Sequence, residues 1–131
     1  MMLAVLGAQV ALTDQEYALP LLAKSVAVNF SSAVSNQARA VATVPVVEKC
    51  QWGEPFESCG ILKSWAKSVD VVVFSDVLYH DSAYLLLIQT LSELVSPTTD
   101  VFFSFETRKA TIESNFLLQL EQKFDVKRSP V

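Results

Sequence analysis

The chain has 131 residues, of which 51% are hydrophobic and 18% are charged, and its formal net charge is −4. This length and composition suit one domain with a sizeable core, and they exclude a two-domain protein and a disordered chain. An acidic chain whose basic residues form no cluster is a poor candidate for binding nucleic-acid phosphates.

The pattern of apolar residues predicts strands alternating with helices along the whole chain. In chain order we expect a strand over residues 7–13, a helix over 17–30, a strand over 41–49, a short helix over 61–67, a strand over 69–75, a helix over 84–95, a strand over 100–105, a helix over 112–124 and the start of a further strand over 124–128. The segments 31–39 and 53–60 are loops by composition.

Single residues support several of these elements. Pro20 is compatible with the first turn of a helix, where a missing N–H costs little, and Pro45 favours an edge position for its strand. The β-branched run of residues 69–75 is typical of a strand buried on both faces of a parallel sheet. Asp81 can cap the helix that follows, and Pro97 ends that helix.

Alternating strands and helices of this length predict an α/β fold whose sheet is mostly parallel, with right-handed crossovers. In such sheets ligands bind beyond the carboxyl ends of the strands, so the residues at those ends are the candidates for a site. The strand ends are Asp14, then Gln51 and Trp52, then residues 76–80, then residues 106–108.

Two of these residues suit a nucleoside. Asp14 follows the first strand, where an acidic side chain can accept hydrogen bonds from both hydroxyls of a ribose. Asp14 could equally cap the next helix. Trp52 offers a flat apolar surface to an adenine, although a tryptophan is by itself more often part of the core.

The buried strand ends in Asp76 and continues to Tyr79. A tight turn into the next helix could bring both polar side chains into one cleft. The alternative is that Asp76 accepts hydrogen bonds from loop amides while Tyr79 packs. His80 is more often an exposed or capping histidine than a catalytic base. The phosphate-binding glycine motifs and the serine-hydrolase elbow are absent from the sequence.

The remaining composition bears on metals and compartment. Cys50, Cys59 and His80 cannot supply the four ligands of a structural zinc site, so we expect no metal. No apolar run approaches the ~20 residues that span a bilayer, and the apolar start has no basic residue before it, so we expect no membrane association. Two reduced thiols in a cytoplasmic protein are a better reading than a disulfide.

Taken in order, several stretches resemble one family, the seven-strand protein-lysine methyltransferases that carry a D-x-x-Y motif and use S-adenosyl-L-methionine. The resemblance covers most of the chain and implies a Rossmann-like methyltransferase sheet. The matching stretches are Leu6-Gly7-Ala8 through Leu12-Thr13-Asp14, then Leu19 to Asn29, Gln51-Trp52-Gly53, Ser75-Asp76-Val77-Leu78-Tyr79-His80, the leucine-rich helix after it, and Phe105-Glu106-Thr107-Arg108.

The resemblance implies a role for each matching residue. Asp14 would hold the cofactor ribose and Trp52 would lie beside the adenine. Ser75 and Asp76 would contact the cofactor, and Asp76 with Tyr79 would border its methionine end and the entering lysine. The implied reaction is in-line attack of a neutral lysine amine of a protein substrate on the sulfonium methyl, helped chiefly by alignment of the reactants.

The family pattern also extends beyond this chain at both ends. Its first strand with a glycine-rich loop, which lies in the middle of the sheet, and its terminal antiparallel hairpin have no counterpart here. We therefore expect residues 1–131 to form a single partial methyltransferase domain. Two other readings stay open, a catalytically inactive methyltransferase-like module that binds a protein partner and a small-molecule methyltransferase.

Overall fold

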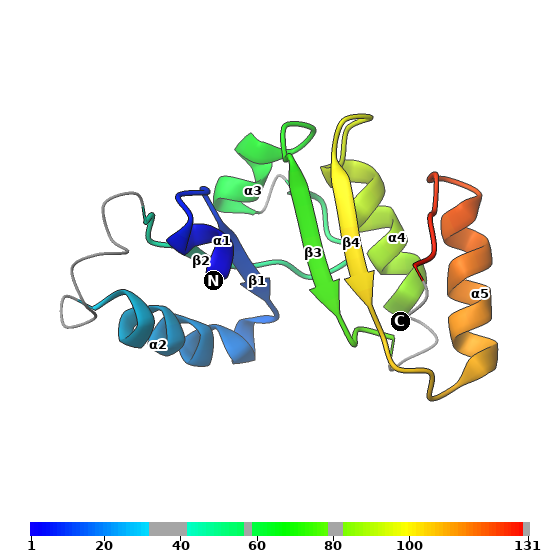
Figure 1. Cartoon of the computed structure of the whole chain (residues 1–131), viewed down its shortest axis with the longest axis horizontal. Helices are drawn as coiled ribbons and strands as arrows, with labels where there is room; N and C mark the ends of the chain where they lie inside the picture. The colour runs from blue at the N-terminus through cyan, green and yellow to red at the C-terminus, as the bar shows by residue number, and fades with distance from the viewer. Residues whose placement is uncertain (32–41, 57–58, 79–82, 130–131) are drawn as a thin grey trace. The chain divides into compact units, whose positions relative to one another are not determined.

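The computed structural model describes residues 1–31, 42–56, 59–78 and 83–129 (Figure 1). These residues group into two compact units. The first unit comprises Met1–Gln51 and Glu57–Ser64, and the second comprises Trp52–Phe56 and Trp65–Val131. Each unit is built on one pair of parallel strands, and each is described by itself below.

The first unit combines two strands with short helices. Its elements are α1 (Met2–Val5), β1 (Ala11–Asp14), the 3-10 helix η1 (Glu16–Ala18), α2 (Leu19–Phe30), β2 (Val46–Lys49) and α3 (Gly60–Trp65). Strands β1 and β2 are parallel, with Ala11 opposite Val46 and Asp14 opposite Lys49. The two strands therefore end together, and Asp14 lies at their carboxyl edge.

Local chemistry explains where these elements start and stop. Gly7 has a positive φ of 95°, which lets the chain turn out of α1, and a proline occupies the first turn of α2. The carboxylate of Glu48 accepts the backbone N–H groups of Ile61 at 2.9 and 3.0 Å and of Leu62 at 3.1 Å. Glu48 in β2 thus supplies acceptors that the N-terminus of α3 would otherwise lack.

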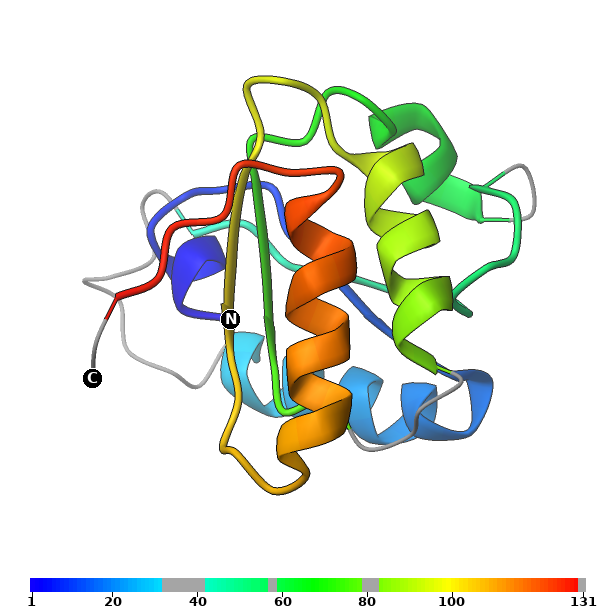
Figure 2. The same ribbon diagram turned by 90° about the vertical axis from the view of Figure 1, so that its right-hand side faces the viewer.

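The second unit alternates strands and helices. Its elements are β3 (Val71–Ser75), α4 (Ala83–Leu94), β4 (Asp100–Ser104) and α5 (Ala110–Glu121). Strands β3 and β4 are parallel and in register from Val71 opposite Asp100 to Ser75 opposite Ser104. Figure 2 shows α4 and α5 side by side with the strand pair behind them.

The core of the second unit lies between these helices and one face of the strand pair. Apolar side chains of both helices form the buried cluster, which consists of Leu87, Ile88, Leu91, Val95, Phe116 and Leu120. Alternate strand residues pack against it, namely Val72 and Phe74 of β3 and Val101 and Phe103 of β4. The rings of Phe74 and Phe103 are stacked with centroids 5.4 Å apart, and Phe116 meets Phe103 edge-on at 5.8 Å.

The opposite face of the β3–β4 pair is exposed, which corrects one expectation from the sequence. The β-branched run predicted a strand buried on both faces, yet Val73 is 63% exposed and its cross-strand partner Phe102 is 59% exposed. The physical reason is that both helices of this unit pack on the same face of the strand pair. A run of valines reports the tendency to form a strand but not which faces are covered.

The predicted alternation of elements is otherwise confirmed, with strands shorter than expected. The predicted helices correspond to η1 with α2, and to α3, α4 and α5, and both strand pairs are parallel. Pro45 precedes β2, whose one strand partner among the described residues is β1. The proposed cap Asp81 and nearly all of the predicted loop 31–39 lie outside the described residues.

The further strand expected over residues 124–128 is wrong. These residues follow α5 without regular structure. Phe124 and Val126 instead pack against the core cluster of the second unit. A strand needs a neighbour for its backbone hydrogen bonds, and no ladder partner for this segment exists in the described part of the chain.

Candidate functional site

Asp76 immediately follows β3 and has an unusual backbone conformation. Its φ is 53°, in the left-handed region that few residues other than glycine adopt and that aspartate tolerates better than most. Its N–H donates to the carbonyl of Ser104 at 3.0 Å, which extends the β3–β4 ladder by one bond. The carboxylate therefore projects from a backbone fixed at the carboxyl end of the strand pair.

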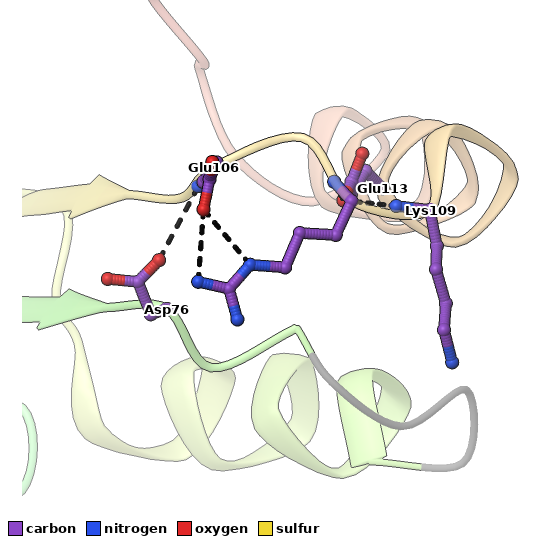
Figure 3. Close-up of polar contacts among 5 residues, drawn as sticks. Asp76, Glu106, Lys109 and Glu113 are labelled. Atoms are coloured by element: carbon purple, nitrogen blue, oxygen red, sulfur yellow. Dashed lines mark hydrogen bonds and ion pairs between the residues drawn. The ribbon is translucent and has the colours of Figure 1, made fainter.

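The loop after β4 runs beside this carboxylate. Asp76 Oδ1 accepts the backbone N–H of Glu106 at 3.4 Å, which is long for a hydrogen bond (Figure 3). A pocket of about 110 Å³ lies here, lined by Asp76, Leu78, Glu106, Arg108 and Lys109. The second unit thus brings two acidic and two basic side chains around one small cavity.

Glu106 and Arg108 form an ion pair across this loop. The guanidinium donates from Nε at 3.1 Å and from Nη2 at 3.0 Å to the same oxygen, Oε2 of Glu106 (Figure 3). The side chain of Arg108 is 69% exposed and that of Glu106 is 74% exposed. A pair this exposed contributes little stability because solvent screens it and its ordering costs entropy.

Glu113, in the first turn of α5, fixes the conformation of this loop. This side chain is only 4% exposed, and its Oε1 accepts the backbone N–H groups of Arg108 at 2.6 Å and of Lys109 at 2.9 Å. Its second oxygen, Oε2, is buried without a hydrogen-bond partner among the described residues. The carboxylate thereby satisfies two amides at the helix N-terminus and holds the residues that line the pocket.

Asp14 belongs to the first unit. It is exposed at the end of β1, and its Oδ1 accepts the N–H of Gln15 at 2.7 Å. The N-cap positions of η1 and α2 are Gln15 and Ala18, so Asp14 does not occupy the helix-capping position that the sequence left as an alternative. The carboxylate is exposed, so it can face a ligand.

Trp52 belongs to the second unit and has a packing role. The half-buried indole packs against the core cluster of α4 and α5. The neighbouring Gly53 donates its N–H to Oγ1 of Thr90 at 2.9 Å and has a φ of 82°, and a Cβ there would lie 2.6 Å from a methyl carbon of Leu86. Only glycine fits this turn, which sets the position of the tryptophan.

The other residues at the end of β3 differ in whether the structure describes them. Ser75 is exposed at the end of β3, directly before Asp76 and opposite Ser104. The proposed Tyr79 and the neighbouring His80, to which no catalytic role was given, lie outside the described residues. The structure brings Ser75 and Asp76 together with the loop after β4, whereas Asp14 is part of the first unit.

The sequence pointed to the end of β4 but assigned no role to Lys109 or Glu113. A glutamate as the fourth residue of a helix, just after a loop from a strand enters that helix, was a usable signal for backbone capping. Its burial could not be read from the sequence. The part of the chain that the structure describes holds no cluster of three or more His, Cys, Asp or Glu side chains that could bind a metal, and none of its helices is long and apolar enough to cross a membrane.

Comparisons with known proteins match most of the chain. The family model described as lysine methyltransferase matches residues 1–123. Protein N-lysine methyltransferase METTL21A from Mus musculus is 31% identical over 125 residues, which is 95% of this chain and 51% of that protein. EEF1A lysine methyltransferase 3 from Xenopus tropicalis is 33% identical over 108 residues, or 82% of this chain and 42% of that protein.

A further relative, METTL21A from Danio rerio, is 32% identical over 123 residues, which cover 94% of this chain and 50% of that protein. The chain thus spans about half the length of the curated relatives it matches. The short parallel strand pairs and their helices agree with an incomplete Rossmann-like methyltransferase sheet. With a family model matched over nearly its whole length, the chain belongs to the lysine methyltransferase family.

Proposed function

We propose that this chain carries part of the site of an S-adenosyl-L-methionine-dependent protein-lysine N-methyltransferase, and that residues 1–131 form one partial methyltransferase domain. Family membership and the names of the relatives support this reading. The observation that carries it is the position of Asp76, whose backbone has a left-handed conformation at the carboxyl end of β3 and whose side chain lines a small charged pocket. Residues held in such conformations concentrate at functional sites.

The chemistry of the available side chains fits the cofactor. Asp14 presents an exposed carboxylate at a strand end, which suits the two hydroxyls of a ribose. Trp52 keeps part of its indole exposed for an adenine while the rest packs on the core. Ser75 and Asp76 are exposed at the end of β3 and suit the methionine end.

The cofactor supplies the methyl group of its sulfonium, and the chain must prepare the lysine. A lysine amine with a pKa near ~10.4 is mostly charged at neutral pH and cannot attack until it loses its proton. We assign Asp76 and Tyr79 to the border of the amine, where they hold its nitrogen in line. Most of the rate gain then comes from this alignment.

The proposed substrate is a lysine side chain of a cytoplasmic protein. Mouse METTL21A is named for protein lysine methylation and the Xenopus relative for EEF1A. Cys50 and Cys59 are both thiols, as is usual in the reducing cytoplasm. The acidic net charge of −4 favours a protein substrate over nucleic acid.

Isothermal titration of the purified chain with S-adenosylhomocysteine tests this function, after circular dichroism confirms folding. Micromolar binding that is lost in Asp14→Ala and kept in the matched surface variant Glu16→Ala supports the cofactor site. Transfer of labelled methyl to lysines of a cytoplasmic protein extract then tests the reaction. A folded chain that binds no S-adenosylhomocysteine would support the inactive protein-binding module instead, and labelling of small metabolites alone would support a small-molecule methyltransferase.

A further inference from the structure

The pocket beside Asp76 has the size of one side chain. Its volume is about 110 Å³, whereas pockets that hold a whole cofactor or drug-sized ligand measure roughly 300–1,000 Å³. One wall is the apolar side chain of Leu78, and the rest is charged. Such a pocket suits an aliphatic stem that ends in a polar group.

The charges around the pocket are not all compensated. Glu106 and Arg108 neutralise each other in their ion pair. The carboxylate of Asp76 has the single long contact from the Glu106 N–H, and the ammonium of Lys109 has no hydrogen-bond or ion-pair partner within the described residues. The pocket therefore presents one uncompensated anion and one uncompensated cation.

We propose that this pocket selects a substrate lysine that has an acidic neighbour. The lysine stem packs on Leu78, its amine lies at Asp76, and the acidic side chain next to it pairs with Lys109 at the exposed rim. This inference rests on the proposed function. A lysine alone would be repelled by the ammonium of Lys109, and an acidic neighbour offsets that repulsion.

Glu113 is the positioning residue of this arrangement. Its buried carboxylate fixes the backbone of Arg108 and Lys109 at 2.6 and 2.9 Å, so the cation at the rim starts from a fixed point. A backbone that is already fixed lowers the entropic cost of ordering the site when a ligand binds. Lys109 thus acts as a specificity residue rather than as one of many mobile surface lysines.

Fluorescence anisotropy tests the selection without any methyl transfer. Fluorescein-labelled peptides carry one central lysine flanked by Glu, by Ala or by Lys, and their Kd values are measured with and without S-adenosylhomocysteine. We expect the Glu-flanked peptide to bind roughly two- to fivefold more tightly than the Ala-flanked one, the size of an exposed ion pair. In Lys109→Glu the order should invert, so that the Lys-flanked peptide binds best.

The matched control is Lys123→Glu, which makes the same change of charge at an exposed residue after α5. It should keep the original order of the peptides. Equal Kd values for the three peptides, or a Lys109→Glu variant that weakens them all alike, would overturn the inference. So would a glutamate-flanked peptide that binds equally well with its lysine replaced by norleucine, because the pocket would then recognise only the acid.

The proposed function and this inference fail in different ways. Peptide selection by a chain that does not bind S-adenosylhomocysteine would uphold the pocket and contradict methyl transfer. Binding of S-adenosylhomocysteine without binding of any lysine peptide would uphold the cofactor site and contradict the pocket.

Discussion

The buried carboxylate of Glu113 holds the backbone N–H of Lys109 at 2.9 Å, and it also holds the preceding N–H of Arg108. The start of α5 and the loop that lines the pocket are therefore one structural piece. Because the Glu113 side chain is only 4% exposed, its hydrogen bonds are shielded from solvent, and their effect on stability should be measurable.

Glu113→Ala should lower the free energy of unfolding by about 2–3 kcal/mol, because two amides lose a charged acceptor. Glu113→Gln keeps an acceptor oxygen and should cost about 1 kcal/mol or less. Urea denaturation followed by circular dichroism gives these values. Glu106→Ala in the same loop is the control and should cost less than about 1 kcal/mol, since its ion pair is exposed. Equal losses in Glu113→Ala and Glu106→Ala would show that the amides do not depend on Glu113.

Phe116 should be the most sensitive residue of the second unit. Its side chain is fully buried and contacts the rings of Phe103 and Tyr84 edge-on at 5.8 and 6.3 Å. Phe116→Ala should cost about 3–5 kcal/mol, from lost burial and the cavity left behind. Leu118→Ala on the same helix is the matched control, because Leu118 is 57% exposed and should cost about 0.5 kcal/mol.

Thermal unfolding of the two variants separates these expectations. A loss in Phe116→Ala no larger than in Leu118→Ala would mean that the helices α4 and α5 do not pack as described.

Much of the fold could be predicted from the sequence because the relevant forces are local. The β-branched run that ends at Asp76 is a strand by intrinsic preference, and the apolar spacing around Phe116 is helical. The exposed face at Val73 could not be predicted, because exposure depends on which helices pack there. The failed strand after Phe124 has the same cause, since a strand is completed by a neighbour that local sequence does not specify.

In the site, too, some features follow from the local sequence and others depend on the fold. The position of Asp76 follows from the rule that ligands bind at the carboxyl ends of parallel strands. The setting of its left-handed backbone depends on contacts between segments about 30 residues apart in the chain, such as the hydrogen bond from the Glu106 N–H to the Asp76 carboxylate. The capping by Glu113 is local in sequence, but the burial of its carboxylate depends on the fold. The alternative roles of Trp52, core or cofactor, both describe a half-buried indole, so the sequence left them open.

The exposed apolar face of the β3–β4 pair should bind hydrophobic dyes. Val73 and Phe102 lie opposite each other on that face and are 63% and 59% exposed. The double variant Val73→Thr, Phe102→Thr should lower the fluorescence of bound anilinonaphthalene sulfonate and slow aggregation, while stability changes by less than about 1 kcal/mol. The inward pair Val72→Thr, Phe103→Thr is the control and should unfold the unit. Unchanged dye fluorescence in the outward variant would mean that this face is covered in solution.

The left-handed backbone of Asp76 separates its structural role from its proposed chemical one. Asp76→Gly removes the strain of a φ of 53° and should be at least as stable as the parent, whereas Asp76→Ala should be less stable than Asp76→Gly by about 1–2 kcal/mol. Asp76→Asn keeps both the shape and the tolerance for this conformation, so its stability should match the parent. All three variants lose the carboxylate and should bind a lysine peptide about fivefold more weakly, as expected for one exposed charge pair. Urea denaturation gives the stability of each variant, and fluorescence anisotropy on the same samples gives its affinity for the lysine peptide. If lysine-peptide affinity followed stability, high in Asp76→Gly and low in Asp76→Ala, then Asp76 would act through the backbone of the turn and its carboxylate would have no part in binding the amine.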